Sequence, residues 1–327
     1  MSVLRIGTRR SALALAQARA VAEALHEPAE IVAITTAGDV DRARGDKSRW
    51  TSALEAALLA GEIDLAVHSA KDVPGELAEG TELVATPRRA DPYDVLVGER
   101  ALEEVREGAR VGTSALRRRA QLLAARSDLD VVDLRGNVDT RLRKRAAGEV
   151  DVLVLAAAGL TRLGRRGDAG ATLKGDVFVP APGQGTIAVQ ARTGSPAAAA
   201  ASVASHARTM ACLRAERAAV RELDATCHTP VGIHADLVAG GLRLRGFAGL
   251  PDGSAWLIDE ITAEAQETAA GADQTAAGAA EIAAGADEIA AGAEAAGLAL
   301  ARRMLAAGAR ELLRDAERMA ARAVARP

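Results

Sequence analysis

The chain has 327 residues, of which 49% are hydrophobic and 2% aromatic, and its formal net charge is −3. This length allows roughly two or three domains, each with its own core, and the hydrophobic content excludes a chain that is disordered throughout. Because no N-terminal stretch has the length and apolarity of a secretory signal, and no run of about eighteen uncharged apolar residues occurs, we expect a soluble cytoplasmic protein.

Strand and helix patterns alternate over the first hundred residues. Residues 3–7 and 31–36 are typical of strands, and between them apolar residues recur at helical spacing from Ser11 to about Leu25. Further on we expect a helix over about 51–60, followed by strands at 64–69, 82–86 and 94–98. This β-α-β opening predicts an α/β domain.

The same alternation continues in the next stretch, where basic residues are crowded. The expected elements are a strand at 110–114, a helix at 116–126, a strand at 131–135, a helix at 137–147, a strand at 150–159 and a helix to about Leu163. Such alternation predicts a mostly parallel sheet that is covered on both faces. Ligands of these sheets bind beyond the carboxyl ends of the strands, and the local excess of Arg points to an anionic ligand.

The C-terminal part has a different pattern. Residues 180–189 contain Pro and Gly before a strand, which indicates a crossover between domains. A helix over 207–223, a meander of strands within 231–262 and a terminal helix follow. Residues 268–295 are four copies of an Ala- and Gly-rich heptad, which predicts a marginal helix. Coiled-coil pairing is the alternative, although its seam would consist of Ala, Thr and a few Ile.

The first candidate for chemistry is the pair Lys71 and Asp72, at the end of the strand at 64–69. A neighbouring Lys and Asp usually form a surface ion pair of little value, but this position favours a cleft equally well. An Asp beside a Lys stays ionised at neutral pH, so it can stabilise a developing cation and exchange a proton with a nitrogen.

Four strand-to-helix junctions carry Arg, or Ser and Thr with Gly, as carboxylate and phosphate sites do. Their residues are Arg9 and Ser11, then Thr113, Ser114, Arg117 and Arg118, then Arg135, Gly136 and Arg141, and finally Arg162. Four such junctions predict a ligand with several anionic groups. We expect Arg119, Arg143 and Arg145 to lie on solvated helix faces instead. We expect no nucleic-acid partner, because aromatic side chains for stacking are scarce.

The two cysteines are too few for a disulfide framework, and their spacing from the five histidines predicts no metal site. Cys212 lies within a predicted helix and suits a small buried apolar residue. Cys227 lies in a loop next to His228, which favours a reactive or modified thiol. A cysteine hydrolase that uses Cys227 and His228 is one alternative, and a two-lobed receptor for an anionic metabolite, which would need an export signal or lipid anchor, is another.

Seven segments, taken together, resemble the hydroxymethylbilane synthase family, also called porphobilinogen deaminase. They lie in the same order over nearly the whole chain: 5–17 (RIGTRRSALALAQ), 66–74 (AVHSAKDVP), 111–118 (VGTSALRR), 134–142 (LRGNVDTRL), 158–164 (AGLTRLG), 182–185 (PGQG) and 227–232 (CHTPVG).

The resemblance implies three domains. The first and second are lobes similar to those of periplasmic binding proteins, with mostly parallel sheets around a cleft. The third is a smaller α/β domain that presents the cysteine loop. In this chain the implied ranges are 1–99 with 181–204 for the first domain, 100–180 for the second, and 205–327 for the third, which includes the heptads.

The resemblance also implies a transferase that condenses four porphobilinogen molecules into hydroxymethylbilane, releases four ammonia molecules, and acts as a monomer. Cys227 would hold a dipyrromethane cofactor through a thioether, and Asp72 would be the catalytic carboxylate that stabilises the cation left when ammonia departs. The implied cofactor contacts are Ser69, Lys71, Asp72, Thr113, Ser114, Arg117, Arg118 and Gly136. The implied substrate contacts are Arg9, Ser11, Gln17, Arg135, Arg141, Arg162 and Gln184.

The chain departs from the family pattern at three places. Ala115 replaces a serine, so one hydroxyl donor is missing. Residues 41–50 replace a longer Gly-rich lid, with Trp50 where a Phe is common. Ala225 and Thr226 replace two glycines that usually precede the cysteine.

Overall fold

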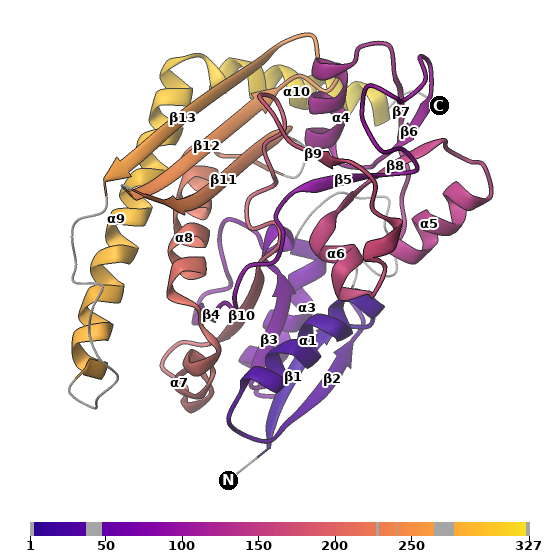
Figure 1. Cartoon of the computed structure of the whole chain (residues 1–327). Coiled ribbons are helices and arrows are strands. Elements are labelled where there is room, and N and C mark those ends of the chain that lie inside the picture. Colours follow the sequence, from indigo (N-terminus) through magenta and orange to yellow (C-terminus); the bar gives the residue numbers. More distant parts are fainter. Residues whose placement is uncertain (1–2, 37–47, 227–228, 240, 265–277, 325–327) are drawn as a thin grey trace.

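The computed structural model describes residues 3–36, 48–226, 229–239, 241–264 and 278–324. Their helices and strands form two α/β lobes and a third group that is built on a smaller sheet (Figure 1). The α/β class expected from the alternating patterns is therefore confirmed.

The first lobe contains a five-stranded sheet in the order β2-β1-β3-β10-β4. Its strands are β1 (Leu4–Arg9), β2 (Ala29–Ile34), β3 (Leu65–Ser69), β4 (Thr81–Ala85) and β10 (Ile187–Arg192). Strand β1 pairs in parallel with β2 and β3, whereas β10 is antiparallel to both β3 and β4. Four strands therefore run in one direction, and β10 returns against them.

Helices cover both faces of this sheet because successive side chains of a strand point to opposite sides. Ile6 and Val67 pack with α1 (Ala12–Ala24) and α7 (Pro196–Ala201). Ala66, next to Val67, belongs instead to the cluster formed by α3 (Ser48–Leu59). Helix α1 begins after Ser11, whose hydroxyl accepts a hydrogen bond from the Ala14 amide at 3.2 Å, as an N-cap does.

The second lobe repeats this plan with the order β7-β6-β8-β5-β9. Its elements are β5 (Asp94–Val97), β6 (Arg110–Gly112), α4 (Leu116–Ala125), β7 (Asp130–Val132), α5 (Val138–Ala146), β8 (Val152–Ala156), α6 (Ala157–Arg162) and β9 (Thr172–Leu173). Strand β6 is parallel to β7 and β8, and β5 is antiparallel to β8 and β9.

Two expectations are corrected here. Strand β5 pairs in the second sheet, so the expected boundary at residue 99 put it in the wrong lobe. An apolar strand has the same pattern in either sheet, and its long-range pairing decides where it belongs. The strand expected over 150–159 ends at Ala156, where helix α6 begins.

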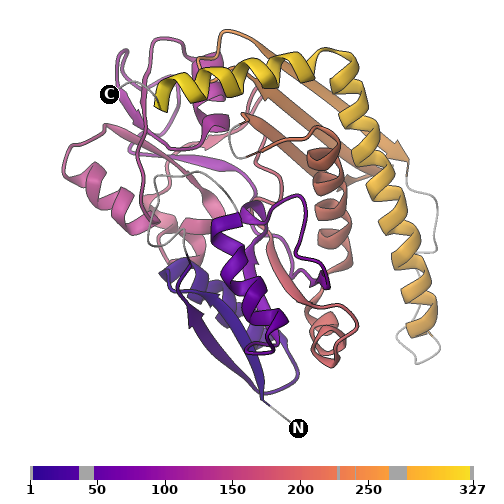
Figure 2. The same cartoon turned by 180° about the vertical axis from the view of Figure 1, so that it is seen from behind.

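The third group is a three-stranded antiparallel sheet that is covered on one face by helices. It contains α8 (Ala207–Glu222), β11 (Val231–Val238), β12 (Gly241–Gly249), β13 (Trp256–Glu264), α9 (Gly278–Ala306) and α10 (Ala309–Val324). Ile233, Leu244 and Leu300 are fully buried in the core between this sheet and the helices. Figure 2 shows α9 and α10 on the back of the sheet.

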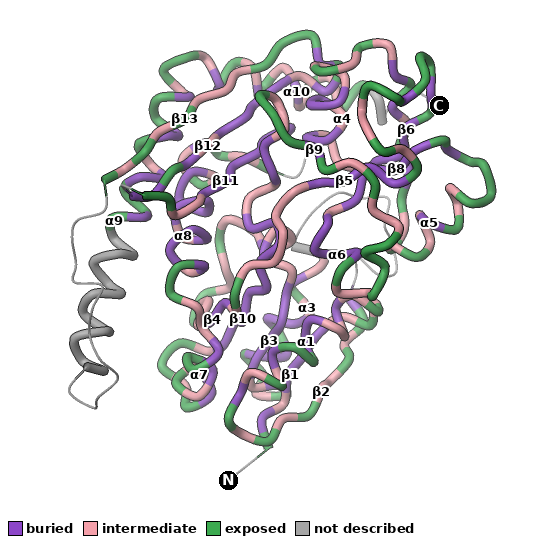
Figure 3. Tube along the Cα trace, viewed as in Figure 1, coloured by how far each residue is buried: buried purple, intermediate pink, exposed green. Residues whose placement is uncertain are grey.

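The heptad segment is helical from residue 278, where α9 begins, and residues 268–277 lie outside the described part. Figure 3 shows that buried residues concentrate in the central strands of both lobes and in α8. Among the described residues, no helix combines the length and the apolarity needed to span a membrane. Three single-turn 3-10 helices complete the described elements: η1 (Ala70–Asp72), η2 (Arg166–Asp168) and η3 (Ser202–Ala204).

Candidate active site

A cavity of about 490 Å³ lies where the two lobes meet. From the first lobe it is lined by the ends of β1 and β3, and from the second by the starts of α4, α5 and α6. Residues 181–186, which lead from the second lobe back to β10, also line it. The cavity therefore occupies the carboxyl edge of both sheets, where α/β proteins bind ligands.

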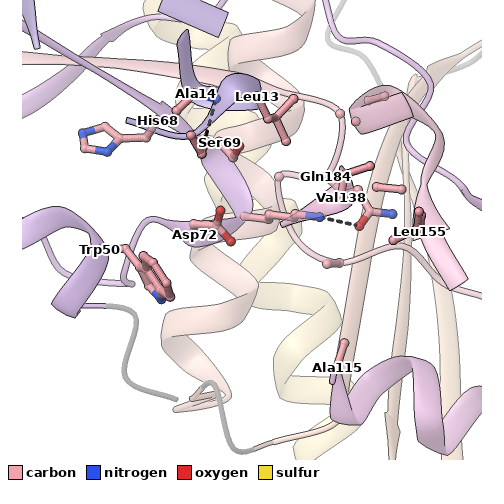
Figure 4. Close-up of a pocket in the computed structure, with 18 of the residues that line it drawn as sticks. Leu13, Ala14, Trp50, His68, Ser69, Asp72, Ala115, Val138, Leu155 and Gln184 are labelled. Carbon is pink, nitrogen blue, oxygen red and sulfur yellow. Dashed lines mark hydrogen bonds between the residues drawn. The ribbon is translucent and has the colours of Figure 1, made fainter. Parts of the chain in front are cut away.

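Asp72 lies at the end of η1, the single turn that follows β3. The Ala70 amide donates to the Thr186 carbonyl at 3.0 Å, which ties this turn to the start of β10. In Figure 4 the carboxylate of Asp72 points into the open space, on the side where Trp50 lies, with Gln184 opposite. The turn thus presents a half-buried carboxylate to the cavity.

Lys71 points toward the second lobe. Its ammonium group donates to Gln184 Oε1 at 3.3 Å, the bond drawn beside Gln184 in Figure 4. Burial, together with the smaller effect of the nearby Arg118 charge, lowers the pKa of Lys71 to about 8. This ammonium group is poised to lose its proton slightly above neutral pH.

Gln17 and Ser69 connect α1 to the end of β3. The Gln17 amide donates to the Ser69 hydroxyl at 2.9 Å, and the same hydroxyl lies 3.0 Å from Gln17 Oε1. Gln17 is buried, so this contact satisfies a polar group that is inaccessible to water. The pair fixes the strand end from which the Lys71 and Asp72 turn starts.

Arg117 and Arg118 share one buried carboxylate, Asp94, at the start of β5. Each guanidinium lies 2.7 Å from an Asp94 oxygen, and all three side chains are nearly inaccessible to solvent. Burial alone would raise the pKa of Asp94, but the two arginines outweigh it and hold this pKa well below its usual range. The cluster carries a net positive charge toward the cavity.

Arg141 and Arg162 are held by backbone carbonyls. Arg141 Nε donates to Gly136 O at 2.8 Å, and Arg162 donates to Gly185 O at 2.6 Å. Burial lowers the pKa of each to about 10, which leaves both cationic at neutral pH. Arg135 is more exposed and pairs with Asp133 at 2.9 Å.

Arg9 completes the basic lining from the first lobe. Its guanidinium carbon lies 3.8 Å from the centroid of the Trp50 ring, a cation–π contact. His68 lies beneath this part of the cavity, with its Nε2 3.0 Å from Gln190 Oε1. Burial lowers the pKa of His68 to about 4, so this imidazole is neutral at physiological pH.

Fourteen of the sixteen residues predicted for the site line the cavity: Arg9, Ser11, Gln17, Ser69, Lys71, Asp72, Ser114, Arg117, Arg118, Arg135, Gly136, Arg141, Arg162 and Gln184. Thr113 lies outside this lining, and its hydroxyl accepts from the Ala115 amide at 3.2 Å in the turn before α4. Cys227 and His228 lie outside the described residues. Ala225, Thr226 and Thr229, on either side of them, do line the cavity.

Asp94 is the main residue that sequence analysis missed. Its sequence signal was an acidic residue directly before the apolar strand residues 95–97, because such a residue needs a cationic partner if it is buried. Cys212 agrees with its expectation, since it is buried in α8 and burial raises its pKa to about 12. Arg119 is half-buried and donates to the Val131 carbonyl, so it is not simply solvated.

The lining is suited to a polyanionic ligand that reacts beside a carboxylate. Within the described ranges, seven basic side chains (Arg9, Lys71, Arg117, Arg118, Arg135, Arg141 and Arg162) line the cavity, against two acidic ones, Asp72 and Asp139. The same ranges contain no group of three or more His, Cys, Asp or Glu side chains arranged to hold a metal ion.

Known proteins match the chain over most of its length. The family model described as porphobilinogen deaminase, dipyromethane cofactor binding domain, matches residues 4–200, and the model of the porphobilinogen deaminase C-terminal domain matches residues 210–281. A porphobilinogen deaminase of Thermus thermophilus is 42% identical over 96% of this chain and 99% of its own. One of Thiobacillus denitrificans is 40% identical over 96% of this chain and 98% of its own.

Among solved structures, a periplasmic substrate-binding protein of an ABC transporter from Coxiella burnetii superposes on 62% of this chain and 91% of its own. Its TM-score is 0.38 and its sequence identity is 14%.

Proposed function

Because this chain belongs to the porphobilinogen deaminase family, we propose that the cavity between its lobes is the active site and that Asp72 is its catalytic carboxylate. The chain is a transferase of tetrapyrrole synthesis. It deaminates porphobilinogen and joins four molecules head to tail into hydroxymethylbilane on a covalently bound dipyrromethane.

The charge of the lining supports this use of the cavity. Each porphobilinogen unit carries an acetate and a propionate, so a dipyrromethane presents four carboxylates. The seven basic side chains come from both lobes, and guanidinium groups bind carboxylates through paired hydrogen bonds. We assign cofactor contacts to Ser69, Lys71, Ser114, Arg117, Arg118 and Gly136, but not to Thr113, which lies outside the lining. We assign substrate contacts to Arg9, Ser11, Gln17, Arg135, Arg141, Arg162 and Gln184.

Cys227 is the residue to which we assign the thioether. Thr226 and Thr229, on either side of the segment that contains it, line the cavity, and the Thr226 amide donates to the Thr229 hydroxyl at 2.9 Å. A buried alternative, Cys212, is enclosed by α8 and the third-domain core. When bound, the dipyrromethane supplies the pyrrole carbon that forms the new bond.

Asp72 acts on the substrate in this proposal. Loss of ammonia from the aminomethyl group leaves a cation delocalised into the pyrrole ring, and the carboxylate of Asp72 stabilises it. Asp72 would also accept the proton that is released when the carbon–carbon bond forms. Lys71 and the arginines hold the carboxylates of the substrate and orient its aminomethyl carbon.

The observation that carries the proposal is the position of the Asp72 carboxylate within a predominantly basic lining that both lobes contribute. Its test is the intact mass of the untreated protein, followed by peptide mapping and reaction with Ehrlich's reagent. We expect a two-pyrrole mass increment on Cys227 and a pyrrole chromophore. An unmodified mass would refute the tether, and ester hydrolysis abolished by thiol alkylation would then favour a cysteine hydrolase.

We further propose a cytoplasmic monomer with three domains, in which the first lobe ends before β5 and resumes near residue 181. The topology of the two sheets supports this division. Light scattering at several protein concentrations tests the monomer: a mass near 33.5 kDa at every concentration is expected. A concentration-dependent doubling would contradict it.

A further inference from the structure

Glu216 is a fully buried carboxylate at the junction of the three domains. It lies on α8 of the third domain, and its side chain has no exposed surface. Its Oε1 accepts from Arg89 at 2.6 Å and from the Ala235 amide at 2.8 Å, and its Oε2 accepts from the Gly183 amide at 2.5 Å. A carboxylate buried in this way must be well paired, and this one is.

Two of the three donors to Glu216, Arg89 and Gly183, lie on the two segments that connect the lobes. Arg89 lies between β4 and β5, where the chain leaves the first lobe, and Gly183 lies where the chain returns to it. Arg89 also donates from Nε to the Gln184 carbonyl at 2.8 Å, which joins the two segments directly. One side chain of the third domain therefore holds both connections between the lobes.

Gly183 also packs against η1, the turn that bears Lys71 and Asp72. Its φ is +72°, and a Cβ at this position would lie 2.9 Å from the Ala70 carbonyl carbon and 3.0 Å from the Lys71 amide nitrogen. The backbone of residue 183 is thus packed against the backbone of η1. The neighbouring Gln184 accepts from the Lys71 ammonium. Two contacts therefore connect the segment that Glu216 holds to the turn that bears Asp72.

Glu216 is ionised in this environment. Burial raises its pKa, but the charge of Arg89 and the contact with His234 outweigh this and leave the pKa below its ordinary value. The charged form accepts stronger hydrogen bonds than a neutral amide or acid would. His234 Nδ1 lies 3.6 Å from Glu216, and its Nε2 lies 2.8 Å from Asp236.

We propose that Glu216 is a positioning residue for the reaction, which holds the third domain in fixed register with the Lys71 and Asp72 turn. Helix α8 ends at Glu222, shortly before Cys227, so the same helix bears this contact and leads into the loop to which we assign the tether. The inference rests on the proposed function. It adds that Glu216, which contacts neither Asp72 nor the substrate, holds the third domain against the segment that packs on the Lys71 and Asp72 turn.

The test is Glu216→Gln in the primer-bearing holoenzyme, with turnover expressed per mole of primer determined by intact mass. The amide keeps the shape of the side chain but has one acceptor oxygen, so Gly183 or Arg89 loses its hydrogen bond to residue 216. We expect kcat to fall about ten- to hundredfold, as small misplacements of catalytic groups do, with KM changed less than about threefold. The matched control is Glu222→Gln, on the same helix as Glu216, which removes an exposed pair with Arg302 of α9 and should keep wild-type kcat.

A purely structural role would lower the melting temperature while leaving kcat per primer unchanged well below that temperature, and this result would overturn the inference. If Glu216→Gln does not fold, Arg89→Lys decides: it keeps a charge for Glu216 but removes the donor to Gln184 O, and kcat should again fall. Normal kcat in Arg89→Lys would then overturn it. A wild-type protein without primer or turnover would instead contradict the proposed function.

Discussion

The Arg9 guanidinium lies above the indole ring of Trp50, 3.8 Å from the ring centroid. Both residues line the cavity from the first lobe. Trp50 belongs to α3, and Arg9 is the last residue of β1. The ring on α3 thus orients the Arg9 guanidinium at the end of β1, a group that we assign to substrate binding. An aromatic face orients the guanidinium without neutralising its charge.

Replacement of Trp50 by Leu should weaken substrate binding. A cation–π contact is worth about 0.5–2 kcal/mol, so we expect KM for porphobilinogen to rise roughly two- to thirtyfold, with a smaller rise in Trp50→Phe, which keeps an aromatic face. Steady-state kinetics measure both. Equal KM values in Trp50→Leu and the wild type would show that the ring does not orient Arg9 for binding.

Substitution of Asp72 by Asn should preserve the primer and abolish most turnover. The amide keeps the size of the side chain but neither stabilises a cation nor accepts a proton at neutral pH, so we expect a loss of about 10²- to 10⁴-fold in kcat. Intact mass measures the primer and product formation measures kcat. Asp139→Asn, at the edge of the same cavity beside Arg165, should stay within about threefold of wild type. Near-normal turnover in Asp72→Asn would contradict the assigned role.

The pKa of Lys71, about 8, predicts a pH dependence of substrate binding. The ammonium group predominates below this pH and is lost above it, so KM for the carboxylate-bearing substrate should rise between about pH 7.5 and 9. Lys71→Arg stays protonated and should flatten this part of the profile. A wild-type KM that is constant over this range would contradict the prediction.

Deprotonation of Lys71 at high pH should weaken substrate binding, but it should stabilise the folded protein. The folded-state pKa of Lys71 lies below its unfolded value of about 10.4, so the unfolded chain binds more protons between these two values. The free energy of unfolding of the ligand-free protein should therefore rise with pH there, as far as Lys71 contributes. Comparison of urea denaturation in the wild type and Lys71→Met isolates this contribution, and parallel curves would contradict it.

Removal of the Asp94 carboxylate should destabilise the second lobe. Asp94→Asn leaves Arg117 and Arg118 buried without their anion, and we expect the free energy of unfolding to fall by about 3–5 kcal/mol. Because the folded-state pKa of Asp94 is lowered, its stabilisation is present above its unfolded pKa of about 3.9 and is lost as the pH falls below that. Asp128→Asn, which breaks a more exposed pair with Arg126, should lower the free energy of unfolding much less in the same urea titration.

The sequence predicted much of the fold and of the site because both depend on local patterns. Alternating strands and helices placed Arg9, Ser69 and Asp72 at strand ends, and the ends of parallel strands meet at one edge. The partners of Arg117 and Arg118 could not be predicted, because they depend on β5 crossing into the second sheet. That crossing is a long-range pairing, and the apolar pattern of 94–98 is compatible with either sheet.

The buried contacts of Glu216 were hidden for a similar reason. In the sequence it is one acidic residue in a helix that also contains several arginines, a pattern typical of a solvated face. Its burial follows from the docking of the third domain on the connections between the lobes. Such docking is decided by shape and by pairing across domains, so no local signal marks it.

The cavity is preorganised for anions by the cluster of Arg117, Arg118 and Asp94. Asp94 and the Val154 and Val179 carbonyls immobilise both guanidinium groups within the fold, so ordering these two long side chains adds little entropic cost when a carboxylate arrives. A rigid receptor also presents the same geometry after each turnover step. One site can therefore process four identical building blocks in succession, because its own reorganisation does not have to be repeated for each.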